Sequence, residues 1–148
     1  MLFDASTDAG MTGHPRPARV VFACIHNAGR SQMAAALFNA SANPAVATAI
    51  SAGTAPGPHV HPVVVAAMAE RGINLSHARP QLLTDELAAA ATMLITMGCG
   101  EACPHVPGLA REDWPLEDPG GRSLDEVRAI RDDIADRVGQ LLTRRGWT

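Results

Sequence analysis

The stretch that decides the fold of this chain runs from Val20 to Ser31 and reads VVFACIHNAGRS. Its first part is a continuous apolar run, which is typical of a strand buried in a parallel sheet. Cys24 ends that run, Arg30 follows after five intervening residues, and a helix-forming segment begins at Ser31. The sequence therefore predicts a strand, a tight loop and a helix in succession, with a thiol at one end of the loop and a guanidinium at the other.

A loop that enters a helix in this way presents backbone N–H groups to an anion, and the helix dipole adds partial positive charge. We therefore expect the loop to cradle a tetrahedral oxyanion. The same field favours the thiolate form of Cys24. A nucleophile and an oxyanion cradle in one loop indicate attack on the central atom of a phosphate-like ion. The predicted cradle consists of Ile25, His26, Asn27, Ala28, Gly29 and Arg30.

Individual side chains of the loop have separate predicted roles. Arg30 can bind two oxyanion oxygens at once with its planar guanidinium. Ser31 can donate a hydrogen bond to the Cys24 thiolate. Gly29, together with Asn27, is expected to supply the positive φ angles that a nest of inward N–H groups requires. The alternative is a buried cysteine that ends a strand and is followed by an incidental arginine.

Beyond this loop, the chain alternates strands and helices. The expected strands are 19–24, 47–51, 93–97 and 111–114, and the expected helices are 31–42, 62–71, 85–91 and 123–145. Pro62 and Thr84 mark helix starts, and Ser123 with Glu126 forms a capping box. This order predicts an α/β fold, a parallel sheet with helices on both sides. Ligands of such sheets bind at the carboxyl ends of the strands.

Composition narrows the function further. The chain has 148 residues, is 47% hydrophobic and 18% charged, and has a net charge of −3, which indicates a single globular domain and no nucleic-acid partner. It contains no apolar run near the about 20 residues that cross a membrane. It also contains no lysine, which excludes a Walker lysine and a Schiff-base lysine. Residues 1–18 are predicted to be a disordered extension of the domain 19–148.

Two further cysteines follow the expected strand 93–97, in the sequence MGCGEACP. If this segment forms a helical turn, the sulfurs of Cys99 and Cys103 lie on one face, close enough for a disulfide near the surface. A metal site completed by His105 is an alternative, and two inert buried cysteines are another. Three cysteines without a secretory signal favour the reducing cytoplasm, where thiols are more often catalytic or metal-bound than structural.

The loop from Cys24 to Ser31 resembles that of the low-molecular-weight tyrosine phosphatases and of the arsenate reductases built on their fold. The motifs AGRSQMA at 28–34, SAGT at 51–54 and WPLEDP at 114–119 look most like the arsenate reductase branch. His61-Pro62 and Arg79-Pro80 are similar too, and the resemblance covers about residues 19–145. It implies a single-domain, three-layer α/β/α fold with a four-stranded parallel sheet of low-molecular-weight phosphatase-like, flavodoxin-like topology.

The resemblance also implies a general acid. It places Asp118 over the oxyanion cradle, where a carboxyl group can protonate a departing oxygen, although Asp118-Pro119-Gly120 is also an ordinary turn sequence. Phosphatases of this fold usually carry two tyrosines after the acid, and this chain has Gly120 and Gly121 instead. That difference favours a small inorganic ion over phosphotyrosine. Ala35 stands where some reductases of this fold carry an acid for potassium, so we expect no potassium site. No other metal site and no cofactor are expected.

In an arsenate reductase of this kind, Cys24, Cys99 and Cys103 relay oxidation outward to a thioredoxin-like reductant. Arsenate is then the substrate, with phosphate and sulfate as competing oxyanions. Two alternatives remain open at this point. The chain could be a low-molecular-weight phosphatase in which water resolves the Cys24 adduct. It could also be a redox or arsenite sensor without catalytic activity.

Overall fold

The apolar run that ends at Cys24 forms β1, Ala18–Cys24, in the interior of a parallel sheet. The computed structural model describes residues 16–99 and 103–148. The sheet has the order β2-β1-β3-β4, and all of its strand pairs are parallel, as predicted. The other strands are β2, Ala47–Gly53; β3, Met93–Thr96; and β4, Ala110–Asp113.

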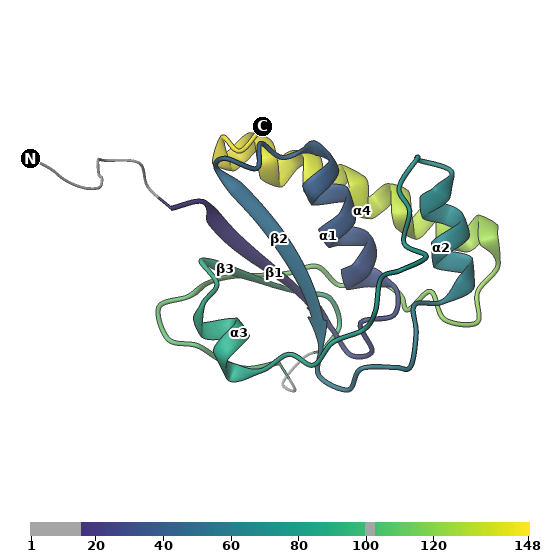
Figure 1. Ribbon diagram of the computed structural model, residues 1–148, viewed down its shortest axis with the longest axis horizontal. Coiled ribbons are helices and arrows are strands. Elements are labelled where there is room, and N and C mark those ends of the chain that lie inside the picture. The colour runs from purple at the N-terminus through teal and green to yellow at the C-terminus, as the bar shows by residue number, and fades with distance from the viewer. Residues whose placement is uncertain (1–15, 100–102) are drawn as a thin grey trace, which may run out of the picture.

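Helices cover both faces of the sheet (Figure 1). On one face lie α1, Arg30–Ser41; α2, Pro62–Ala69; and α4, Leu124–Arg145, and on the other lies α3, Asp85–Ala89. Side chains of β1 alternate between the two cores: Phe22 and Cys24 belong to the larger cluster under α1 and α4, and Ala23 belongs to the smaller cluster near α3. This arrangement confirms the three-layer α/β/α fold.

The helix starts follow the sequence signals. Ser123 and Glu126 form the predicted capping box of α4, with Glu126 N donating to Ser123 Oγ at 3.2 Å and Ser123 N donating to Glu126 Oε1 at 3.0 Å. The Thr84 side chain caps α3, and α2 begins at Pro62. Strand β2 continues to Gly53, beyond the predicted end, because Gly53 pairs with Cys24. Ala18, assigned to the extension, already belongs to β1, and residues 1–15 of that predicted extension lie outside the described residues.

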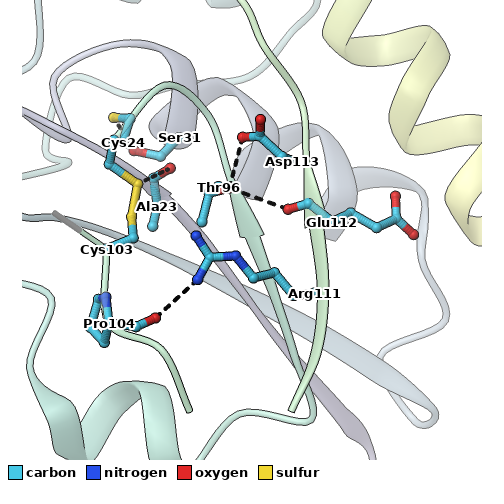
Figure 2. The surroundings of a disulfide bond; sticks show 10 residues. Ala23, Cys24, Ser31, Thr96, Cys103, Pro104, Arg111, Glu112 and Asp113 are labelled. Atoms are coloured by element: carbon cyan, nitrogen blue, oxygen red, sulfur yellow. Dashed lines mark hydrogen bonds between the residues drawn. A yellow bond between two sulfur atoms is a disulfide. The ribbon is translucent and has the colours of Figure 1, made fainter. Parts of the chain in front are cut away.

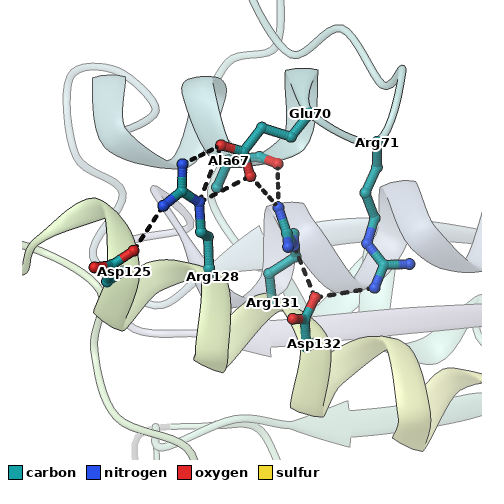
Figure 3. Close-up of polar contacts among 7 residues, drawn as sticks. All are labelled: Ala67, Glu70, Arg71, Asp125, Arg128, Arg131 and Asp132. Atoms are coloured by element: carbon teal, nitrogen blue, oxygen red, sulfur yellow. Dashed lines mark hydrogen bonds and ion pairs between the residues drawn. The ribbon is translucent and has the colours of Figure 1, made fainter.

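An ion-pair network joins the end of α2 to α4 (Figure 3). Arg128 donates to both carboxylate oxygens of Glu70, at 2.6 and 3.0 Å, and Arg131 donates to the same carboxylate at 2.7 Å. The hydrogen bonds from Arg128 and then Arg131 lower the pKa of Glu70 to about 2. Arg71 pairs with Asp132 at 2.9 Å. These contacts fix α2 on α4, and the start of α2 adjoins the loop after β1.

The helices in the described part of the chain do not include one that is long and apolar enough to cross a membrane.

Candidate active site

The loop between β1 and α1 has its carbonyl groups turned outward. Ile25 O accepts from Ala55 N at 2.8 Å, His26 O accepts from Gly57 N at 2.9 Å, and Ala28 O accepts from His61 N at 2.9 Å. In a trans peptide the N–H of the following residue points away from the carbonyl. The N–H groups that follow these three carbonyls therefore point to the inner side of the loop, where an oxyanion cradle needs them.

A buried hydrogen-bond chain ends on the Cys24 sulfur. Asn27 has a φ of 51°, which confirms the predicted left-handed conformation, and it is fully buried. Asn27 Nδ2 donates to Ser31 Oγ at 2.8 Å, and Ser31 Oγ lies 2.9 Å from Cys24 Sγ. Because Asn27 donates to the hydroxyl, the single proton of Ser31 remains for the sulfur. Ser31 thus makes the contact predicted for it and can stabilise a thiolate.

Two glutamines hold Asn27 in place. Gln32 Nε2 lies 3.2 Å from Asn27 Oδ1 and 3.2 Å from Asn27 O, and it also reaches Arg79 O at 3.2 Å. Gln81 N donates to Asn27 Oδ1 at 2.8 Å. The strained left-handed residue is therefore fixed from two separate segments of the chain. Sequence reasoning missed both glutamines as site residues: Gln32 lies on α1 next to the loop but carries no chemical signature, and no local pattern shows that the distant segment of Gln81 covers the loop.

The expectation of a positive φ at Gly29 is wrong. Its φ is −149°, which is not in the left-handed region, and Gly29 is the N-cap of α1. Its lack of a side chain serves a close approach instead, because a Cβ at this position would overlap the ring of Pro119. Glycine is needed here so that the loop bearing Asp118 can pack on the oxyanion cradle.

Arg30 is buried, with 6% of its surface exposed, at the first turn of α1. Its Nη1 donates to Leu116 O at 3.1 Å, which ties it to the Asp118 loop. Its Nε is buried and has no hydrogen-bond partner in the described part of the protein. An unpartnered buried donor is costly, and a bound oxyanion offers the acceptor that this guanidinium lacks.

Asp118 lies beside the cradle, as the resemblance implied. Its Oδ1 accepts from Gly120 N at 2.9 Å, and its Oδ2 lies 3.9 Å from Nδ1 of His26, a residue of the loop itself. About half of the Asp118 side chain is exposed, so the carboxyl group can exchange protons with water. His61, at the start of α2, places its ring against Gly29 and Gly120.

The other two cysteines form a disulfide, with their Cα atoms 5.6 Å apart. Cys99 Sγ lies 3.9 Å from Ala23 O, the neighbour of Cys24, and Figure 2 shows the disulfide to Cys103 beside Ala23 and Cys24. The expectation that the disulfide lies near the surface is wrong, since Cys99 and Cys103 are only 6% and 5% exposed. They belong to the core on the α3 side of the sheet, whereas Cys24 belongs to the opposite core.

The segment after the disulfide is anchored to the sheet. Arg111 Nη1, on β4, donates to Pro104 O at 3.1 Å (Figure 2). Within residues 16–99 and 103–148, no group of three or more His, Cys, Asp or Glu side chains is arranged to hold a metal ion. The described geometry thus offers one free thiol, Cys24, a loop with carbonyls turned outward beside it, and one thiol pair in its oxidised form.

Comparison with known proteins places this geometry in context. Residues 19–145 match the family model of the low molecular weight phosphotyrosine protein phosphatases. A putative arsenate reductase of Halobacterium salinarum is 38% identical over 125 residues, which are 81% of this chain and 87% of that protein. A glutaredoxin arsenate reductase of Synechocystis is 33% identical over 129 residues, covering 85% and 97%.

Solved structures agree with the sequence comparison. A thioredoxin-dependent arsenate reductase of Corynebacterium glutamicum superimposes with a TM-score of 0.75 at 38% identity. The match covers 93% of this chain and 65% of that protein, so the chain spans about two thirds of the length of this structural relative.

Proposed function

Because the chain belongs to the low molecular weight phosphotyrosine protein phosphatase family, and its relatives include arsenate reductases, we propose that it reduces arsenate to arsenite. One observation carries the proposal: an oxidisable pair, Cys99 and Cys103, lies beside the strand end that bears the free thiol Cys24. Phosphoester hydrolysis needs only the first thiol. Reduction of arsenic(V) needs two electrons, which a thiol pair supplies on forming a disulfide.

The first step is the attack of the Cys24 thiolate on arsenic. Arsenate binds to the inward N–H groups of the loop and to the unpartnered Nε of Arg30. A sulfur–arsenic bond forms, and an arsenic–oxygen bond breaks. Asp118 gives its proton to the departing hydroxide, which leaves as water. Ser31 stabilises the thiolate before attack through its 2.9 Å contact with the sulfur.

The second step transfers the electrons. The Cys99 thiolate attacks Cys24 Sγ, the sulfur–arsenic bond breaks, and its electron pair leaves with arsenic as arsenite. Arsenic(V) is reduced to arsenic(III), and a Cys24–Cys99 disulfide remains. Cys103 then attacks Cys99 Sγ and releases Cys24 as a thiolate. The product is the Cys99–Cys103 disulfide, which is the state that this structure represents.

The relay needs movement of the segment after β3. Cys24 and the thiol pair belong to cores on opposite faces of the sheet, so Cys99 has to leave its core to reach Cys24. The buried disulfide also has to become accessible to an external reductant. We propose a thioredoxin-like protein of the cytoplasm for this role. Relatives of this chain include a thioredoxin-dependent and a glutaredoxin arsenate reductase, so both classes of reductant belong in the test.

Two alternative functions explain less of the structure. A phosphatase has no use for the Cys99–Cys103 pair, and Gly120 and Gly121 offer no aromatic wall for phosphotyrosine. A sensor without activity has no use for Asp118 beside the cradle. Residual hydrolysis of small phosphoesters is compatible with the reductase, because the first chemical step is shared.

The experiment is arsenate-dependent oxidation of NADPH by the full chain with thioredoxin and thioredoxin reductase, and separately with glutathione and glutaredoxin. Cys24→Ser abolishes turnover in either system. Cys103→Ser releases about one arsenite per protein and stops as a Cys24–Cys99 disulfide, whereas Cys99→Ser stops with arsenic on Cys24. Mass spectrometry after alkylation distinguishes these species. Asp118→Asn slows arsenite release by roughly 10²–10⁴-fold.

Phosphatase activity towards p-nitrophenyl phosphate, measured in parallel, separates the alternatives. Turnover of this ester without arsenate reduction would establish the phosphatase. Multiple turnover of arsenate by Cys103→Ser with thioredoxin would remove Cys103 from the relay.

A further inference from the structure

Gly98 lies directly against the guanidinium of Arg30. Gly98 follows β3 and precedes Cys99, and it has a φ of +97°. A Cβ built at this position would overlap Nη1 of Arg30 and would lie 3.4 Å from its Cζ. Gly98, the residue directly before Cys99, is therefore in contact with the side chain of Arg30.

The Arg30 guanidinium joins three parts of the site. Its Nη1 donates to Leu116 O, in the loop that leads to Asp118. Its Nη1 end lies against Gly98, and its buried Nε has no partner in the described part of the chain. Because Arg30 is buried and held at Leu116, it has little room to move away from a side chain at position 98. Any displacement at Gly98 thus changes the position of the donor offered to an oxyanion.

We propose that Gly98 is a positioning residue that couples oxyanion binding at Arg30 to the redox state of the Cys99–Cys103 pair. This inference rests on the proposed relay, in which Cys99 leaves its core to reach Cys24. Gly98 is the neighbour of Cys99 in the chain, so that movement alters its contact with Arg30. If the two states of the thiol pair bind an oxyanion with different affinity, the oxyanion must shift the redox equilibrium by the same factor.

The positioning part is tested with inorganic phosphate as the probe, by titration calorimetry on the full chain in its disulfide form. Gly98→Ala forces Arg30 away from Leu116 O or from the phosphate. Loss of a hydrogen bond to a charged group corresponds to about 10- to 150-fold weaker binding. Gly108→Ala is the matched control, because Gly108 has a φ of +80° but nothing within 4 Å of a built Cβ. Equal phosphate affinity in the two variants would overturn the role of Gly98.

The coupling part needs no variant at position 98. Dithiothreitol breaks the Cys99–Cys103 bond, supplying two electrons and two protons as it closes to its own cyclic disulfide. Phosphate affinity is measured on both forms of Cys24→Ser, in which Cys24 cannot enter the exchange. We expect the two dissociation constants to differ at least threefold, and saturating phosphate to shift the dithiothreitol equilibrium by the same factor. Equal dissociation constants would overturn the coupling.

These measurements are independent of turnover. A chain that binds phosphate with this redox dependence but does not reduce arsenate would refute the proposed function and keep the coupling. A chain that reduces arsenate but binds phosphate equally in both redox states would keep the proposed function and refute the coupling. In Gly98→Ala, the ratio of the two affinities falls towards one, whereas Gly108→Ala keeps the ratio of the parent.

Discussion

Replacing Asn27 by Asp tests the hydrogen-bond chain that ends on the nucleophile. In the parent protein, Asn27 Nδ2 donates to Ser31 Oγ at 2.8 Å, which leaves the Ser31 proton available to a Cys24 thiolate 2.9 Å away. A carboxylate at position 27 has no proton to donate and accepts the Ser31 proton itself. Asn27→Asp therefore takes the hydrogen bond away from the sulfur without altering Ser31 or Cys24.

The magnitude follows from the bond that is lost. A hydrogen bond to a charged group contributes about 1.5–3 kcal/mol, so we expect the first attack on arsenate to slow by roughly 10- to 150-fold. The acid keeps the acceptor for Gln81 N, but a carboxylate at this fully buried position lowers the free energy of unfolding, so the stability of Asn27→Asp is measured alongside its activity. Asn27→Ala removes that acceptor and places alanine at a φ of 51°. It should lower the free energy of unfolding by about 2–5 kcal/mol, from one unpaired N–H and one left-handed residue.

The assay is single-turnover arsenite release by Asn27→Asp, Ser31→Ala and the double variant, with urea unfolding of each protein and of Asn27→Ala. If Asn27 acts through Ser31, the two single changes are not additive. Asn27→Asp then slows arsenite release much less in the Ser31→Ala background than in the parent. The slowing that remains comes from repulsion between the new carboxylate and the thiolate. An equal slowing in both backgrounds would refute the reasoning, and Asn27 would then have a structural role only.

Three further predictions concern other parts of the site and its support. Arg30→Lys keeps the charge but loses the planar two-point contact, so the KM for arsenate should rise at least tenfold, and sulfate should inhibit less in the same steady-state assay. Gly29→Ala places a methyl group against Pro119, so arsenite release should slow while phosphate binding, measured by calorimetry, changes less. The pKa of Glu70 is lowered to about 2 by Arg128, so its stabilisation is complete above the unfolded value of about 4.5 and is lost as the pH falls towards 2. The unfolding midpoint of Glu70→Gln should therefore lie below that of the parent at pH 7, and the difference should shrink from pH 4.5 to pH 2; a constant difference would contradict this.

Features encoded within a few consecutive residues were predictable. The apolar run before Cys24, the loop and the helix that follows are one local pattern, and they form β1, the cradle and α1. The capping box of Ser123 and Glu126 also uses residues close together in the chain, so the start of α4 was predicted correctly. The alternation of strands and helices then sufficed for the parallel three-layer architecture, because right-handed crossovers leave few other arrangements.

The sequence alone identified the residues that we propose carry the chemistry: a thiol and a guanidinium at the two ends of a loop, a serine after them, and two more thiols in the segment that follows another strand. The tertiary structure decided how those residues meet. Gly29 is needed because of Pro119, Asn27 is held by Gln81, and Gly98 lies against Arg30. Each of these contacts joins segments far apart in the chain. The tertiary structure also decided on which face of the sheet Cys99 and Cys103 are buried. Burial in one core or the other depends on how helices and strands pack together, which the order of residues along a single element does not specify.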